Sequence, residues 1–587
     1  MPRWILLGFI VGILAGFFAF AFFYLLELAK FVSFDYLAGH PIPNPAGEQI
    51  ITFEVEGHSR KWLYFLLPAV GGLLSGVVVY FLAPEAKGDG TDAMIEAFHH
   101  KQGKVRNRVP LVKSLSSLIT LATGGSAGRE GPISQIGGGL GSWVGNLLKL
   151  NARDRRFLLI AGAGGALGAI FRAPLGCAIV AMEFLYKEDL EVDALIPTVI
   201  SSITAYTVFS EVLIRVSGME GPIFQIPSHL SLTDPRELLF YVGLGLVCVP
   251  LGLFYIRVFY GLRHKVFEPM PIPDYLKPMI GGFAVGLIGL YVPQVYCSGW
   301  GHIQTILMGR LDLIPIKIMA LIVVFKILAT SFTLSSGGSG GLLAPTFVIG
   351  GMIGGVVGYY SHLFFPHIVP EWRSFVLVGM AAFFAGVANA PLGAMFIVTE
   401  MTGNYKLIEP LLLVSVIAII FNRRYSIYMA QVKNKFHSPA HIGEFTVNVL
   451  EDMYVKSVYR PKKKMPTIPA NAGLSQVQDF LAMEEEEIFP VVKQDGTILG
   501  LLSLDTSRPI LFEEGVDQFL IAEDLAIPAG DVHPGDSLYQ ALVEFLKYPI
   551  SGILVTDPDN NNKVLGVLHH RDLIRAYNNE IIKRKQP

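Results

Sequence analysis

The chain contains two versions of one motif. Residues 124–132 read GGSAGREGP and residues 337–345 read GGSGGLLAP, and a shorter motif, APLG, occurs at 173–176 and again at 390–393. Because the two motifs return in the same order at nearly the same spacing, we interpret them as an internal duplication. Both copies lie in very apolar sequence. Repeated membrane halves that carry Gly/Pro-interrupted segments at matching positions indicate a transport site where the halves meet.

Composition also predicts a membrane protein. Of the 587 residues, 52% are hydrophobic and 16% are charged, whereas soluble proteins carry about 25% charged residues. Apolar segments run almost without pause from Trp4 to about Phe421, and two of them, 157–184 and 375–398, read as single segments. The net charge of −2 does not support a nucleic-acid partner. The spacing of the three cysteines indicates neither a disulfide scaffold nor a metal site.

The composition changes sharply after Tyr428. We expect a membrane domain at residues 1–431, a linker at 432–449, and a soluble α/β tail made of two similar units at 450–512 and 519–583. Lys and Arg cluster soon after the last apolar segment, at 431–435 and 460–464. By the positive-inside rule this clustering places the tail in the cytoplasm. The basic run at 460–464 is either a solvated loop or a contact with anionic lipid.

Each tail unit is predicted to contain a helix followed by a β-hairpin. Leu474–Glu486 has helical periodicity, and two short apolar runs follow it, joined by the turn Gln494-Asp495-Gly496-Thr497. The pattern returns with a helix at Leu538–Lys547 and two further strands. The expected strands are Ile488–Lys493, Ile498–Ser503, Gly552–Thr556 and Val564–Leu568.

The sharpest chemical signal is GREGP at residues 128–132. A carboxylate inside a membrane span costs about 3 kcal/mol or more unless it is paired or faces water, so Glu130 is a functional candidate. The glycines and the proline allow the chain to break, turn and start a helix whose amides form an anion site. The carboxylate of Glu130 would compete there with a permeating anion. The alternative is a structural ion pair with Arg129.

With these motifs the chain resembles the CLC family of chloride channels and proton/chloride exchangers, and its tail resembles the tandem CBS domains of many CLC proteins. The resemblance implies an all-α polytopic membrane domain of two inverted repeats, followed by a cytoplasmic α/β tail. It implies transport of chloride or another small anion, and no enzymatic activity. It also implies a homodimer in the lipid bilayer with one pore in each subunit.

The resemblance assigns roles to individual residues. Glu130 matches the family's gating glutamate, the amides of Leu342 and Leu343 would coordinate the anion, and Tyr425 aligns with the pore tyrosine. The implied anion-binding residues are Gly88, Asp89, Gly90, Arg129, Gly131, Leu342, Leu343 and Tyr425.

Asp89 departs from the family pattern. Most members have GSGIP where this chain has Gly-Asp-Gly-Thr-Asp at residues 88–92. An ionised carboxylate in the place of the serine would repel an anion, whereas a protonated one would donate a hydrogen bond to it. Alternatively the loop binds its anion through backbone amides alone, and Asp89 or Asp92 serves as a helix N-cap.

A second departure concerns proton coupling. Exchangers of the family have two glutamates after the APLG motif, and the second one carries protons. Here Glu183 matches the first glutamate and Phe184 stands in place of the second. Phe184 therefore favours a passive gated channel, with a proton-coupled antiporter as the alternative. Glu183 is either a displaced proton carrier or, like its repeat counterpart Glu400, an architectural residue at a helix end.

CBS pairs commonly bind adenine nucleotides, and this tail has two incomplete signatures for that site. The first unit has Ser503 at the Ser/Thr position, whereas the second unit has His569 there and keeps Asp572, which would hold the ribose. Arg571 could offset phosphate charge. We expect that the protein requires no cofactor. The tail is expected either to bind ATP, ADP or AMP between its two units or to be a purely structural dimerisation module.

Overall fold

The computed structural model describes residues 2–51, 59–441, 449–462, 465–484, 486–511, 520–528, 532–548 and 550–585. The chain divides into two compact units, residues 1–440 and 441–587. Each unit has apolar cores of its own. The predicted linker residues 442–448 and the basic residues Lys463 and Lys464 lie outside the described residues.

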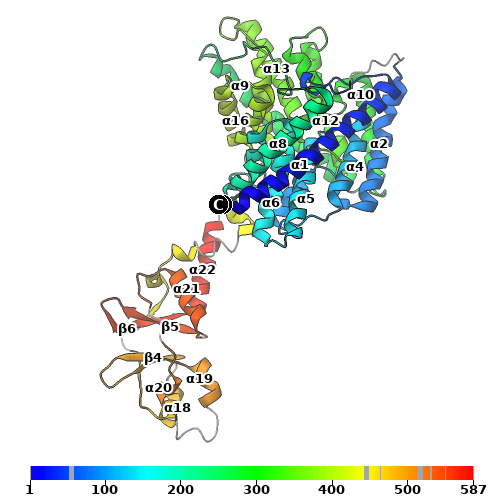
Figure 1. The fold of residues 1–587 in the computed structure, drawn as a ribbon. Helices are drawn as coiled ribbons and strands as arrows, with labels where there is room; N and C mark the ends of the chain where they lie inside the picture. Colours follow the sequence, from blue (N-terminus) through cyan, green and yellow to red (C-terminus); the bar gives the residue numbers. More distant parts are fainter. Residues whose placement is uncertain are drawn as a thin grey trace. The chain divides into compact units, whose positions relative to one another are not determined.

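The first unit is helical and consists of two consecutive sets of helices (Figure 1). The first set is α1 (Pro2–Lys30), α2 (Lys61–Leu82), α3 (Gly90–His99), α4 (Val109–Ala122), α5 (Glu130–Leu147), α6 (Ala152–Phe171), α7 (Pro174–Glu183) and α8 (Leu195–Ser217). The second set is α9 (Glu237–Leu262), α10 (Lys277–Tyr291), α11 (Trp300–Leu307), α12 (Ile316–Ser335), α13 (Leu343–Phe364), α14 (Ser374–Ala388), α15 (Pro391–Thr402) and α16 (Ile408–Asn422).

The two sets repeat one arrangement. Helix α1 packs on α8 as α9 packs on α16, and α5 packs on α6 as α13 packs on α14. The sets meet where α2 packs on α10 and α7 packs on α15. The duplication of sequence motifs is therefore a duplication of helical structure.

The surface of this unit suits a bilayer. Among the described residues, six helical segments are long and apolar enough to cross a membrane. They are Pro2–Ala38, Lys61–Leu82, Val192–Ser217, Glu237–Phe267, Ile316–Ser335 and Leu343–Phe364. Large apolar side chains such as Trp62 and Phe81 are exposed on α2, as expected for helices whose outer faces meet lipid.

Two apolar segments that read as continuous in the sequence are each broken into two helices. The break after α6 lies at Arg172, with φ of 49°, and the break after α14 lies at Asn389, with φ of 57°. An Ala-Pro pair follows each, and the proline begins α7 and α15. A left-handed residue ends a helix, and proline is accommodated at the first position of the next one. The single segments predicted at 157–184 and 375–398 are therefore wrong.

The described residues of the tail form two three-stranded sheets. One has the order β1 (Arg460–Pro461), β6 (Asn560–His569), β5 (Gly552–Asp557), and the other has the order β2 (Ile468–Pro469), β3 (Ile488–Val492), β4 (Ile498–Ser503). The helices are α18 (Leu474–Met483), α19 (Leu504–Leu511), α20 (Ala522–Leu525), α21 (Leu538–Lys547) and α22 (His570–Lys585). The predicted hairpins β3–β4 and β5–β6 are both present and antiparallel.

The boundary between the units differs from the compositional one. Residues after 431 still pack on the helical unit, because Lys187 N donates to Val432 O and Lys435 N donates to a carboxylate oxygen of Asp189. The unit boundary accordingly falls after residue 440 and not after residue 431. Composition marked where the apolar helices end, whereas hydrogen bonds keep the next residues attached to them.

Candidate functional site

Four helices of the first unit begin close to one another. They are α3 at Gly90, α5 at Glu130, α11 at Trp300 and α13 at Leu343. Backbone bridges join Asp89 to Gly340 and Gly128 to Gly341, so the loops before α3, α5 and α13 are in contact. A helix N-terminus carries unpaired N–H groups and a positive partial charge. Their convergence makes this region attractive to an anion, and both halves of the chain contribute to it.

Glu130 is the first residue of α5 and is fully buried. Its Oε1 accepts a hydrogen bond from the indole Nε1 of Trp300 at 3.0 Å. Its Oε2 has no hydrogen-bond partner among the described residues. A Cβ added at Gly128 would lie 2.2 Å from this Oε2. The carboxylate therefore occupies space that is free only because residue 128 is a glycine and has no side chain.

Arg129 is engaged by carboxylates. Its Nη2 is hydrogen-bonded to Glu48 Oε1, its Nη1 lies 3.9 Å from Glu27 Oε1, and its Nε lies 3.8 Å from Glu130 Oε1. The guanidinium also lies over the ring of Phe23. Arg129 is therefore paired mainly with Glu48, and its contact with Glu130, the structural ion pair that the sequence left open, is longer.

Asp89 lies at the same convergence, and its two oxygens serve two helices. Oδ2 accepts from the amides of Thr91 and Asp92 at 2.9 and 3.3 Å, which makes Asp89 the N-cap of α3. Oδ1 accepts from the amide of Leu342 at 2.9 Å. Asp89 is therefore a helix cap, and it also occupies the Leu342 amide that was predicted to coordinate an anion.

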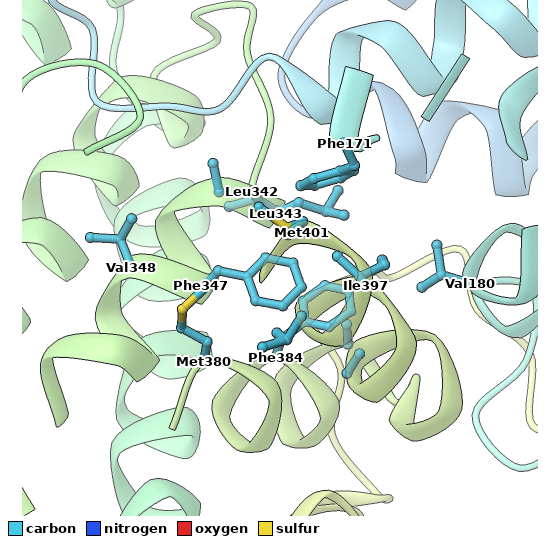
Figure 2. Packing of buried hydrophobic residues seen from close by; sticks show 14 of the residues in the cluster. Phe171, Val180, Leu342, Leu343, Phe347, Val348, Met380, Phe384, Ile397 and Met401 are labelled. Atoms are coloured by element: carbon cyan, nitrogen blue, oxygen red, sulfur yellow. The ribbon is translucent and has the colours of Figure 1, made fainter. Parts of the chain in front are cut away.

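The predicted glycines allow the backbones to approach closely. Gly88 has a φ of +65°, and a Cβ on Gly90 would lie 2.4 Å from Gly131 O. A Cβ on Gly131 would lie 2.3 Å from Asp89 Oδ1. Leu342 and Leu343 are buried, and Figure 2 shows them with Phe171, Phe347 and Phe384 in one apolar cluster. The loop thus contributes polar backbone amides to the site, while the side chains of its two leucines pack into the apolar cluster.

The structure places a different tyrosine at this site from the one predicted. Tyr425 is 46% exposed, and its recorded hydrogen bonds are backbone ones, to Asn422 O and from Asn389. Tyr428 is 1% exposed, and its hydroxyl interacts electrostatically with Asp89. Its ring packs on Phe184, 5.3 Å between centroids. Tyr428, three residues after the predicted Tyr425, is therefore the tyrosine beside the convergent loops.

Glu183 of α7 caps the start of α15, and Glu400 of α15 caps the start of α7. Glu183 accepts from the amides of Leu392 and Gly393 at the start of α15, at 3.2 and 2.8 Å. Glu400 accepts from the amides of Leu175 and Gly176 at the start of α7, at the same two distances. These reciprocal caps support the architectural interpretation of Glu183. Phe184, next to it, is fully buried.

Three residues of the site were missed by sequence reasoning. Trp300 holds Glu130, as described above. Lys113 Nζ donates to Ala86 O and Gly88 O, and Lys326 Nζ donates to Val295 O and Cys297 O. Lys113 comes from α4 and Lys326 from α12, in each half the second helix after the loop that the lysine binds, and both lysines are fully buried. A lysine inside an apolar segment at matching places in both halves was the signal that would have found them.

The tail residues predicted to hold a nucleotide lie at one end of the two hairpins. Ser503 ends β4 and His569 ends β6, and their strand partners Ile488 and Gly552 are in close contact. Asp572 is bound through both oxygens by Arg460, at 2.8 and 2.9 Å. The hydrogen bonds from Arg460 hold the pKa of Asp572 below its ordinary value. Arg571 is exposed beside them.

Comparisons with known proteins agree with this architecture. The family model described as voltage gated chloride channel matches residues 71–423, and the CBS domain model matches residues 532–579. A putative chloride channel protein, ClcB-like, from Ralstonia nicotianae is 30% identical over 357 residues, which cover 60% of this chain and 80% of the relative.

An H⁺/Cl⁻ exchange transporter, ClcA, from Vibrio cholerae is 32% identical over 426 residues, which cover 71% of this chain and 85% of the relative. A solved structure of a slow cyanobacterial Cl⁻/H⁺ antiporter has the same fold, with a TM-score of 0.59 at 21% identity. The match covers 72% of this chain and 95% of that structure. The chain therefore belongs to the CLC family of anion-transporting membrane proteins and carries a CBS domain after its membrane domain.

Proposed function

We propose that this chain exchanges chloride for protons across the membrane, with Glu130 as the group that both blocks the anion path and accepts the proton. The observation that carries the proposal is a fully buried carboxylate at the first residue of α5, among four helix N-termini. A carboxylate and a chloride ion compete for the same positive potential. Binding of chloride therefore favours the protonated form of Glu130, and this competition couples the two ions.

The comparisons favour exchange over a passive channel, which the sequence had favoured because of Phe184. The Vibrio cholerae relative is named as an H⁺/Cl⁻ exchange transporter. The cyanobacterial structure, which shares the fold, is described as a Cl⁻/H⁺ antiporter. We therefore adopt the proton-coupled antiporter.

A passive chloride channel is the second candidate, and one observation favours it. Phe184 is buried against the rings of Tyr428 and Phe384 and offers no titratable group where the family's exchangers carry a proton. A channel would move chloride with no obligatory proton. The two candidates therefore differ in whether a chloride gradient moves protons uphill.

The homodimer with one pore per subunit stays part of the proposal. Its support is that Asp89, Glu130, Trp300 and Leu342 meet within one chain, as a separate pore in each subunit requires. A nucleotide in the tail is also proposed, with Ser503, His569, Arg571 and Asp572 around it. Its support is that Ser503 and His569 pair with Ile488 and Gly552, two residues that are in contact with each other.

Glu130→Gln tests the gate. A neutral amide neither competes as an anion nor carries a proton, so chloride flux in liposomes should lose most of its pH dependence and proton movement should stop. Glu237→Gln is the matched control, because Glu237 is equally buried in the same unit but is bound by Tyr241. Unchanged pH dependence and unchanged proton movement in Glu130→Gln would reject Glu130 as the gate.

A further inference from the structure

A cavity of about 610 Å³ in the membrane domain ends at the convergent loops. Its lining includes Asp92 and Glu96 of α3, Arg263 after α9, and the buried residues Asp89 and Leu342. Glu130 is not among the described residues that line it. Of the two carboxylates at the convergent loops, Asp89 therefore lines the cavity, whereas Glu130 is fully buried.

Asp89 and Glu130 are close to the same short stretch of backbone. Asp89 Oδ1 lies against Gly131, the residue that follows Glu130, and accepts from the amide of Leu342. Glu130 Oε2 lies against Gly128, is fully buried and has no hydrogen-bond partner among the described residues. Both carboxylates therefore lie against the loop at residues 128–131.

Five titratable groups around Asp89, all among the described residues, interact electrostatically with its carboxylate. Lys113 of α4 is the cation that faces it, and its ammonium group also binds Gly88 O. Four further titratable groups interact with Asp89 electrostatically, from its own helix, from α9 and from the segment after α16. They are Asp92, Tyr255, Tyr260 and Tyr428.

The second half of the chain shows that the fold does not need this carboxylate. Lys326 binds the carbonyls of Val295 and Cys297 as Lys113 binds those of Ala86 and Gly88. The residue after Cys297, in the place of Asp89, is Ser298. A buried lysine thus holds its loop in the second half with a serine in that place. A negative charge in the first half alone points to a role in transport.

We propose that Asp89 is the inner proton carrier of the exchange, which takes protons from the cavity and passes them to Glu130. This inference rests on the proposed chloride/proton exchange. A proton on Oδ1 converts that oxygen from an acceptor to a donor and releases the Leu342 amide to the anion. Transfer of the proton to Glu130 returns Asp89 to the carboxylate that accepts from Leu342. Only O–H bonds form and break, and the route avoids Phe184.

Asp89→Ser tests the proposal while keeping the fold. Serine is a good N-cap, so α3 keeps its cap, but serine carries neither a charge nor a transferable proton at neutral pH. In liposomes, the number of protons moved per chloride should fall at least about tenfold, since positioned proton transfer contributes factors of this size or larger. Chloride flux itself should persist. Calorimetry should show tighter chloride binding, because the tethered carboxylate no longer competes.

Glu96→Gln is the matched control, because Glu96 lies on the helix that Asp89 caps and lines the same cavity, and this variant should keep the wild-type ratio. Asp89→Asn is a second variant with the volume of aspartate, in case serine disturbs the loop. A wild-type ratio of protons to chloride in both Asp89 variants would overturn the relay and leave exchange through Glu130 intact. Chloride flux without protons in the wild type would contradict the relay and the exchange together.

Discussion

The indole N–H of Trp300 donates a hydrogen bond to Oε1 of Glu130 at 3.0 Å. Trp300 begins α11 in the second half of the membrane domain, and Glu130 begins α5 in the first half. The indole is itself packed against the rings of Phe171, Phe224 and Phe347. The carboxylate of Glu130 is therefore positioned by a closely packed donor from the opposite repeat.

Trp300→Phe should free the gate. The phenyl ring keeps most of the apolar packing but removes the N–H, and a hydrogen bond to a charged group is worth about 1.5–3 kcal/mol. The carboxylate should leave its position more readily, so chloride efflux from liposomes at neutral pH should rise about tenfold, the size that 1.4 kcal/mol corresponds to. An efflux rate equal to that of wild type would show that Trp300 does not hold the gate.

Glu183→Gln and Glu400→Gln form a matched pair. Each replaces a carboxylate that accepts from two backbone amides with a side chain that has one acceptor oxygen. We expect each to lower the free energy of unfolding by about 1–2 kcal/mol, visible as a lower melting temperature in detergent, with the proton-to-chloride ratio unchanged. Loss of proton movement in Glu183→Gln alone would restore Glu183 as a proton carrier.

Tyr428→Phe and Tyr425→Phe separate the two tyrosines. The hydroxyl of Tyr428 is buried beside Asp89, whereas the side chain of Tyr425 is half-exposed. Removal of the Tyr428 hydroxyl should weaken chloride binding several-fold in calorimetric titrations, since a hydrogen bond contributes about 1 kcal/mol. Tyr425→Phe should bind chloride as the wild type does. The reverse pattern would restore the alignment made from the sequence.

The tail should respond to adenine nucleotides. Asp572 stays ionised at neutral pH, because Arg460 holds the pKa of Asp572 below its ordinary value, and a carboxylate is the acceptor that ribose hydroxyls need. ATP, ADP or AMP at millimolar concentration should raise the melting temperature of residues 449–587 by a few degrees, as a ligand stabilises the state it binds.

Two tail variants sharpen this test. Asp572→Ala should abolish the nucleotide-dependent rise in melting temperature. Arg460→Ala should preserve or enlarge it, because Arg460 currently occupies both oxygens of Asp572. If no nucleotide shifts the wild-type melting temperature, the tail is a structural module.

Much of the architecture follows from sequence. The paired motifs predict the repeat, and the turn at residues 494–497 predicts the β3–β4 hairpin that the structure contains. The breaks at Arg172 and Asn389 were missed because hydropathy averages over a residue in the left-handed region. Local sequence patterns indicate that a helix or a strand exists, whereas a break within an apolar segment depends on the backbone angle of a single residue.

The site was predicted only in part. Glycine and proline in GREGP indicate a helix start at Glu130, and the structure has one there. The contact of Trp300 with Glu130, like that of Lys113 with the carbonyls of Ala86 and Gly88, joins residues far apart in the chain. No local pattern contains such a contact. Tyr425 was chosen over Tyr428 because the two tyrosines differ in burial, which the sequence does not reveal.

Chloride-driven proton movement is the most direct test of exchange through Glu130. Purified protein in liposomes is given an outward chloride gradient, with no proton gradient and the membrane potential clamped, and external pH is recorded. The account predicts net proton uptake into the liposomes, external alkalinisation that stops in Glu130→Gln, and chloride efflux in both proteins. Chloride efflux from the wild type with no change in external pH would contradict the exchange and favour a passive channel.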